Sequence, residues 1–502
     1  MLRTTDPRTA VTADTGLEPT DPAGVARAVD AAATAFEVQR WSSRDERAAL
    51  LEALADGLED DRELLVSTAD RETGLGTARL NGELSRAAFQ FRLFAEAVRE
   101  GGYLEATIDH AGETPIGPGP EIRRMLVPIG PVAVFGSSNF PFAFSVAGGD
   151  TASAIAGGNT VVLKAHSSHL LTSQRSFEAL SRAARAAGAP EGLLGIVYGT
   201  QSGRDLVADP RITAVGFTGS LGAGQALIDL INRREQPIPF YGELSSVNPL
   251  IVTPGAAEAR AEEIAAGLFG SFTLGAGQFC TKPGIAFVPR GAGDEIVEGL
   301  VRRAAEASGQ VLLNERIASS FTEIRDRLVD DGGAQPAAAG TVADDATGFE
   351  AAPTVLTIDA AAFTPALAEE AFGPLVVVAR YDSVDEVVAA LAAVPDSLTA
   401  TVHGEPEESE LVASLTRRLV PLAGRIVYNG YPTGVRVSWA QHHGGGWPAT
   451  NSQHTSVGVS AIRRFLRPVA FQDAPEGVLP VELHEGYTGV PRRVDGVLEL
   501  PA

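Results

Sequence analysis

The sequence predicts an α/β protein whose first domain is built on a doubly wound parallel sheet. From about residue 130 onward, short apolar, β-branched segments alternate with helical stretches. This alternation is typical of parallel strands joined by helices that cover both faces of a sheet. The same alternation resumes at "NPLIVTP" (248–254), which predicts a second α/β domain.

Length and composition limit the class of protein. A chain of 502 residues with 44% hydrophobic and 21% charged residues is expected to form two or three globular domains. The net charge of −23 argues against nucleic acid or an anionic membrane as a partner, since both require a basic surface. The start of the chain lacks a signal-like apolar core, and no run of roughly 18 apolar residues occurs. We therefore expect a cytoplasmic protein.

The first 110 residues are expected to be helical after about residue 20. "DPAGVARAVDAAATAFEVQRW" begins with Asp21, a typical capping residue, and its apolar residues follow helical spacing. "RDERAALLEALADGLEDDRELL" (44–65) has the same pattern. The charged faces of both segments predict solvent-exposed surfaces.

Five strands are expected to form the first sheet. They are 132–136, 160–165, 194–199, 214–220 and 237–243. Polar residues lie at or just beyond the ends of three of these strands, namely Asn139, Lys164 and Ser220. Doubly wound sheets bind ligands beyond the carboxyl ends of their strands, so these side chains are candidate site residues. In the second region, 331–347 is expected to be a surface loop.

Three segments could carry chemistry, and each has an ordinary alternative. "FTGSLGAG" (217–224) would offer amides and a helix start to a pyrophosphate, but it lacks the G-x-G-x-x-G spacing, which favours a plain glycine-rich turn. Glu243 ends an apolar strand, where burial predicts a raised pKa suited to a general base; capping a turn is the alternative. Cys280, the only cysteine, lies among glycines that would let amides approach a carbonyl, and an inert buried thiol is its alternative.

Six motifs taken together resemble the aldehyde dehydrogenase superfamily over essentially the whole chain. They are "FGSSNFPF", "GNTVVLKAHSSH", "VGFTGS", "GELSS", "GQFC" and "EEAFGP", in this order. The branch that oxidises 2-oxoglutarate semialdehyde, the 2,5-dioxopentanoate dehydrogenases, is similar in "GGDTASAIAGGNTVVLKAHSSH", "GELSSVNP" and "HTSVGVSAIRRFLRPVAFQ". The chain departs from the superfamily pattern at Ser246 and Val247, where Gly-Lys is common, and at Thr273, where many relatives have an aromatic residue.

The resemblance implies a role for each matched residue. Cys280 would attack the aldehyde to form a thiohemiacetal and then a thioester, while Asn139 and the Cys280 N–H hold the oxyanion. Glu243 would activate the water that hydrolyses the thioester. The remaining matched residues are implied to bind the cofactor: Ser137, Lys164, Ser220, Glu370 and Phe372.

The implied cofactor is NADP, with NAD as the alternative. NAD-preferring relatives place a glutamate three residues after the lysine that matches Lys164, whereas this chain has Ser167. The missing carboxylate removes repulsion against a 2′-phosphate, and Arg204 would supply a counter-charge.

The substrate pocket is expected to be apolar with one cation. The candidate apolar residues are Phe140, Phe142, Phe144 and Phe279. A dicarboxylic semialdehyde needs a partner for its distal acid group, for which Arg436 is the candidate, although a surface arginine is the alternative. No metal site is expected, because the adjacent His442 and His443 have no carboxylate near them in the sequence. Lys282 is expected to point to the surface.

The resemblance also implies the domain organisation and the activity. The dinucleotide-binding domain would comprise 1–120 and 131–245, and the thiol-bearing catalytic domain 246–445. A β arm and tail (121–130 and 470–502) would assemble a homodimer or homotetramer. The expected reaction is hydrolytic, non-CoA-acylating oxidation of a small-molecule aldehyde, 2-oxoglutarate semialdehyde. The alternatives are a medium- or long-chain aliphatic aldehyde dehydrogenase and a non-catalytic binding protein on the same scaffold.

Overall fold

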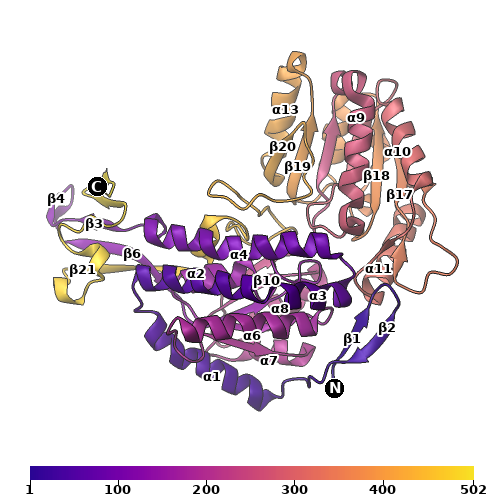
Figure 1. Ribbon diagram of the computed structural model, residues 1–502. Helices are drawn as coiled ribbons and strands as arrows, with labels where there is room; N and C mark the ends of the chain where they lie inside the picture. The colour runs from indigo at the N-terminus through magenta and orange to yellow at the C-terminus, as the bar shows by residue number, and fades with distance from the viewer. Residues whose placement is uncertain (502) are drawn as a thin grey trace.

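The computed structural model describes residues 1–501 and has two α/β bodies with a β arm at one side (Figure 1). The lower body in the figure contains most of the amino-terminal half of the chain, and the upper body contains the second α/β region. The predicted α/β class with two parallel sheets is confirmed.

The first sheet has five parallel strands in the order β11-β10-β7-β8-β9. The strands are β7 (Val132–Phe135), β8 (Val161–Lys164), β9 (Leu194–Val197), β10 (Ala214–Thr218) and β11 (Phe240–Glu243). All five predicted strands are confirmed. Their runs of apolar residues suit a sheet that is covered on both faces.

Helices surround this sheet, and their starts follow the sequence signals. Asp21 caps the first helix by accepting a hydrogen bond from the Gly24 N–H. Ser43 and Glu46 form a capping box at the second. The helices are α1 (Pro22–Gln39), α2 (Arg44–Asp60), α3 (Arg62–Thr73), α4 (Thr77–Glu100), α5 (Gly149–Ala156), α6 (Leu170–Ala186), α7 (Thr200–Ala208) and α8 (Leu221–Ile231). α2 packs against both α4 and α6, and α1 packs against β9.

The second sheet has seven strands in the order β15-β17-β18-β13-β12-β19-β20. Its strands are β12 (Pro249–Val252), β13 (Ile285–Pro289), β15 (Gln335–Ala339), β17 (Thr354–Asp359), β18 (Leu375–Tyr381), β19 (Ser397–His403) and β20 (Ala423–Tyr428). The helices of this body are α9 (Pro254–Thr273), α10 (Asp294–Glu306), α11 (Glu315–Asp330), α12 (Val384–Leu391) and α13 (Ser409–Leu419). Only β15 runs antiparallel to its neighbour.

The prediction that 331–347 is a loop is wrong for part of that segment. Residues 335–339 form the edge strand β15, which pairs with β17 through an irregular register near Pro336. The segment "QPAAA" has a proline and small residues, which give no strand pattern. An edge strand tolerates a proline because one side needs no hydrogen bonds.

The β arm is a five-stranded sheet in the order β21-β6-β3-β22-β23. Its strands are β3 (Thr107–Asp109), β6 (Ile122–Pro128), β21 (Leu466–Gln472), β22 (Arg492–Val494) and β23 (Val497–Glu499). The predicted segments 121–130 and 470–502 lie in and around this sheet, apart from residue 502, which is outside the described residues. Across residues 1–501, no helix is both long enough and apolar enough to cross a membrane.

Three two-stranded sheets complete the described fold. They are β1 (Arg3–Asp6) with β2 (Val11–Asp14), β4 (Gly112–Thr114) with β5 (Gly117–Gly119), and β14 (Gln310–Val311) with β16 (Glu350–Ala351). The β1-β2 hairpin contacts both bodies. Thr4 donates a hydrogen bond to Glu72 of α3, and the Pro7 carbonyl accepts one from the Phe349 N–H.

Candidate active site

A cavity of about 890 Å³ lies at the carboxyl edge of the first sheet, where a doubly wound fold binds its ligands. It is lined by residues that follow β7, β8, β10 and β11, and by residues near α11 and before β18. Ten of the predicted site residues line it: Ser137, Asn139, Phe140, Phe144, Ser167, Ser220, Glu243, Cys280, Glu370 and Phe372. Five predicted residues are not in its lining: Phe142, Lys164, Arg204, Phe279 and Arg436.

The segment before the thiol has an unusual backbone. Gly275, Ala276 and Gly277 all have positive φ angles, of 58°, 57° and 67°. A Cβ on Gly277 would lie 2.2 Å from the Gly373 carbonyl oxygen, so no larger residue fits there. This left-handed run turns the chain from α9 toward Cys280.

Asn248 holds the thiol-bearing segment against the second sheet. Its Nδ2 donates to the carbonyls of Cys280 (2.8 Å) and Lys282 (2.9 Å). Its Oδ1 accepts from Ser246 Oγ (2.7 Å) and from the Thr399 N–H and Oγ1. Ser246, a departure from the superfamily pattern, thus belongs to a buried network that holds the Cys280 segment.

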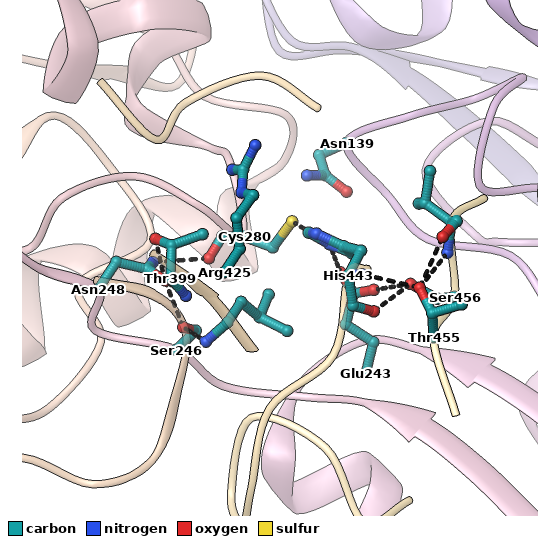
Figure 2. A network of polar contacts seen from close by, with 12 residues as sticks. Asn139, Glu243, Ser246, Asn248, Cys280, Thr399, Arg425, His443, Thr455 and Ser456 are labelled. Carbon is teal, nitrogen blue, oxygen red and sulfur yellow. Dashed lines mark hydrogen bonds and ion pairs between the residues drawn. The ribbon is translucent and has the colours of Figure 1, made fainter. Parts of the chain in front are cut away.

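Cys280, His443 and Glu243 converge at one end of the cavity, and Figure 2 shows the sulfur directed at the His443 ring. His443 Nε2 lies 3.5 Å from Cys280 Sγ and 3.1 Å from Glu243 Oε1. The imidazole and the carboxylate are almost fully buried. Ser456 donates from Oγ to Glu243 Oε2 at 2.5 Å, so both carboxylate oxygens are held.

His443 therefore has the carboxylate partner that its sequence neighbourhood lacks. Glu243 lies 200 positions earlier in the chain and reaches it through the fold. The potential metal donors of Glu243, Cys280 and His443 all lie within 4.8 Å of one another. Because the thiol faces the cavity beside an amide donor, we interpret these contacts as a hydrogen-bonded catalytic group.

The predicted raised pKa of Glu243 is wrong. Burial does raise this pKa, but His443, Ser456 and Cys280 stabilise the ionised carboxylate and together lower the pKa to about 2. A strand-end position indicates burial and nothing about these partners. At neutral pH the carboxylate is therefore ionised and firmly held.

Burial raises the pKa of the Cys280 thiol well above its ordinary value, and the charge of Glu243 raises it further. The Cys280 N–H donates no hydrogen bond to any residue within 1–501. Asn139 Nδ2 donates one of its two hydrogens to the Gln278 carbonyl at 2.9 Å. The second hydrogen and the Cys280 N–H are free to bind an oxyanion.

The other end of the cavity is polar and contains a helix start. Ser220 caps α8, whose first amides face the cavity beside Gly219 and Gly222. Ser137 Oγ is buried without a hydrogen-bond partner among the described residues. Burial lowers the pKa of Lys164 to about 8. Arg204 is an exposed residue of α7.

Glu370 and Lys282 form a buried charged group behind the thiol. Burial raises the pKa of Glu370 to about 7, and its Oε2 accepts from the Ser246 N–H at 3.3 Å. The prediction that Lys282 points to the surface is wrong, because the side chain is 3% exposed and Nζ donates to the Leu375 carbonyl at 2.8 Å. Burial lowers its pKa to about 8.

Comparison with known proteins fits this geometry. The sequence pattern of the aldehyde dehydrogenase family matches residues 4–466. This chain belongs to the aldehyde dehydrogenase family. An α-ketoglutaric semialdehyde dehydrogenase 2 of Azospirillum brasilense is 43% identical over 486 residues, which cover 95% of this chain and 92% of that protein. An α-ketoglutaric semialdehyde dehydrogenase of Acinetobacter baylyi is 41% identical and covers 94% and 91%. The crystal structure of an NAD-dependent aldehyde dehydrogenase from Sinorhizobium meliloti has a TM-score of 0.79 at 25% identity and covers 94% and 92%.

Three of the predicted phenylalanines form one cluster in this aldehyde dehydrogenase. The Phe140 ring lies 5.3 Å from the rings of both Phe144 and Phe279, edge to face. Phe142 points away into the core of the first body and is fully buried, so its assignment to the pocket is wrong. Phe140 and Phe144, two positions away on either side, line the cavity instead. Arg436 is exposed to solvent.

Three residues of the site in this aldehyde dehydrogenase were not assigned to it from the sequence. His443 and Ser456 lie on irregular segments after β20, where no local pattern marks a function. Asn248 gave one usable signal, a polar residue at the start of the apolar run "PLIV". Its φ of +57° is accessible to asparagine more readily than to most residues.

Proposed function

We propose that this aldehyde dehydrogenase oxidises 2-oxoglutarate semialdehyde to 2-oxoglutarate with NADP. The names of the relatives from Azospirillum and Acinetobacter support the substrate, since both align over more than 90% of this chain. The observation that carries the chemistry is the contact of Cys280 Sγ, His443 Nε2 and Glu243 at one end of a large cavity.

Cys280 is the nucleophile. Its thiol is protonated at neutral pH, so the proton must leave as sulfur attacks the aldehyde carbon. The His443–Glu243 pair lies within reach and takes that proton. The carbonyl oxygen becomes an oxyanion of the thiohemiacetal, and the free hydrogens of Asn139 Nδ2 and the Cys280 amide stabilise it.

The thioester is then hydrolysed by water. The proton taken from the thiol first passes to solvent, which leaves the pair free to act again. Glu243 with a pKa of about 2 is a weak base alone, so Glu243 and His443 together accept the water proton. Ser456 keeps the carboxylate from rotating. Hydroxide attack breaks the C–S bond and releases the acid, and the departing Cys280 thiolate takes back the water proton from the His443–Glu243 pair.

The cavity residues fit a dinucleotide cofactor. The partnerless Ser137 hydroxyl and the capped start of α8 at Ser220 offer donors for a pyrophosphate. Glu370 and Phe372 would position the nicotinamide ribose and ring near the thiol, and Lys164 the adenosine ribose. NADP, when bound, supplies an acceptor for the hydride that leaves the thiohemiacetal carbon.

Preference for NADP rests on charge. Ser167 lines the cavity where a glutamate would repel a 2′-phosphate. Arg204 is the proposed counter-charge. The preceding residue of α7, Gly203, packs so closely against Lys164 that a Cβ on it would lie 3.2 Å from Lys164 Cγ. α7 therefore packs beside the lysine that is proposed to bind the adenosine ribose. NAD is the alternative.

The domain roles follow the two bodies and the arm. Residues 1–120 and 131–245 form the cofactor domain and 246–445 the catalytic domain. The β6-β21 pairing joins 122–128 to 466–472 and gives the arm a long edge suited to a second copy of the chain. We assign it to assembly of a homodimer or homotetramer, which light scattering of the purified protein would test.

Steady-state kinetics tests the proposed function. kcat/KM is measured from NADPH absorbance for 2-oxoglutarate semialdehyde, succinate semialdehyde and hexanal, with Cys280→Ala as the inactive control. The highest value is expected for 2-oxoglutarate semialdehyde with NADP. A higher value for hexanal would favour the aliphatic alternative, a higher value with NAD would refute the cofactor preference, and no turnover of any aldehyde would refute the enzyme.

A further inference from the structure

One face of α4 presents charged residues to the phenylalanine cluster at the substrate end of the cavity. Arg79, Glu83 and Arg86 follow one another at helical spacing on this face. The Arg86 guanidinium carbon lies 5.1 Å from the Phe144 ring centre and 5.6 Å from that of Phe140. Both rings line the cavity that contains Cys280. Arg86 is not itself in the lining of the cavity, but it lies directly against two rings that are.

The other two charged groups of this face make hydrogen bonds, although Arg79 Nη1 and Glu83 Oε2 have no partner among the described residues. Arg79 donates from Nη2 to the Asn139 carbonyl at 2.8 Å and so supports the oxyanion donor. Glu83 Oε1 accepts from the Phe142 and Ala143 N–H groups at 2.8 and 3.0 Å. Both contacts fix the backbone that follows β7.

Arg86 has no such partner. Its Nε and Nη2 atoms are buried, and within residues 1–501 it makes neither a hydrogen bond nor an ion pair. Burying a charged donor without an acceptor is costly, and native structures retain such groups where a ligand completes them. Because arginine stays protonated, the missing partner is an anion.

Charged neighbours act on this guanidinium. Burial lowers the pKa of Arg86, while the charges of Glu83, on the same helix face, and of Glu243 raise it. Arg425 also lies near Cys280 in Figure 2. Its two Nη atoms, however, donate to the carbonyls of Pro432 and Gly434. Arg425 Nε and Arg79 Nη1 are also buried without a partner, but both guanidiniums are held by other hydrogen bonds, whereas partly buried Arg86 makes none in the described part of the chain.

We propose that Arg86 binds the carboxylate of the substrate and makes the site selective for aldehydes that carry an acid group at the opposite end. This inference rests on the proposed function and replaces Arg436 as the partner of the distal acid. The guanidinium offers a carboxylate two parallel N–H donors, while Phe140 and Phe144 pack along the carbon chain. A neutral aldehyde leaves Arg86 unpaired, so it gains less from the same pocket.

The test compares an acidic and a neutral aldehyde of equal chain length, succinate semialdehyde and butanal. In Arg86→Gln, the ratio of kcat/KM for succinate semialdehyde to that for butanal is expected to fall about 100-fold, mainly through KM, since a charged hydrogen-bonded pair is lost. Arg86→Lys keeps the charge but not the fork, and is expected to recover part of the ratio. Arg436→Gln, at an exposed position, is expected to keep the wild-type ratio.

Three results would overturn the inference. They are an unchanged ratio in Arg86→Gln, an equal loss for both aldehydes, and a fall of the ratio in Arg436→Gln. Binding of succinate, measured as protection of Cys280 from iodoacetamide, gives a second readout that needs no turnover; protection that persists in Arg86→Gln would also contradict the inference. Failure of the proposed function is separate, because it appears as a wild-type enzyme that does not oxidise 2-oxoglutarate semialdehyde.

Discussion

Replacing His443 with glutamine removes the imidazole that joins the thiol to the carboxylate. In the wild type the pKa of Glu243 is about 2 against an ordinary value of 4.5. That difference corresponds to about 3 kcal/mol in favour of the ionised carboxylate. Burial alone would raise this pKa, so the variant keeps only Ser456 and Cys280 as opposing contacts. We expect the Glu243 pKa in His443→Gln to rise above 4.5.

The sign of the pH effect follows from this shift. A depressed carboxyl pKa contributes stability that is present above pH 4.5 and is lost as the pH falls toward 2. His443→Gln is therefore expected to lose up to about 3 kcal/mol at pH 7, and the difference from wild type shrinks in acid. Urea unfolding at pH 7 and at about pH 3, inside the window between the two pKa values, measures it.

Catalysis gives the sharper assay. Rapid mixing separates the first turnover, in which the proposed thioester forms, from the later hydrolysis of that thioester. In the wild type, the rate of thioester hydrolysis should not fall through protonation of Glu243 at any pH above about 4. In His443→Gln this rate should begin to fall at a higher pH, and at pH 7 it should be about 100-fold lower than in the wild type. His442→Gln is the matched control, since its ring has no hydrogen-bond partner within the described chain. Coincident pH profiles for wild type and His443→Gln, or an equal loss in His442→Gln, would refute the reasoning.

Three further predictions concern the thiol, its support and the cofactor. Because the Cys280 pKa is raised, alkylation by iodoacetamide in cofactor-free enzyme should accelerate with pH through 9; a plateau near pH 7 would contradict the buried, neutral thiol. Asn248→Ala removes the hydrogen bonds to the Cys280 and Lys282 carbonyls. It should lower the free energy of unfolding in urea by about 2–4 kcal/mol and reduce kcat. A change below about 0.5 kcal/mol would mean that the network is dispensable. Ser167→Glu should raise the ratio of kcat/KM for NAD to that for NADP at least tenfold, and an unchanged ratio would place the 2′-phosphate elsewhere.

Local sequence pattern was sufficient for the first sheet. Each of its strands is a short apolar run between turns and helical segments, and in a parallel sheet covered on both faces such a run has no other stable place. The motif order also placed Asn139, Glu243 and Cys280 together at the cavity. Each of these residues follows a strand or a glycine-rich turn whose position the alternation of elements determines.

The sequence by itself determined the α/β class, the strands of the first sheet and three residues that line the cavity: Cys280, Asn139 and Glu243. Tertiary structure alone decided the chemistry around them. His443 meets a thiol 163 positions earlier and a carboxylate 200 positions earlier, and Arg86 lies against the Phe140 and Phe144 rings from the helix α4. The tertiary structure also places Phe142 in the core and buries Lys282. Propensity and periodicity act over a few residues, whereas the pKa of a buried group depends on whatever distant charges packing brings to it.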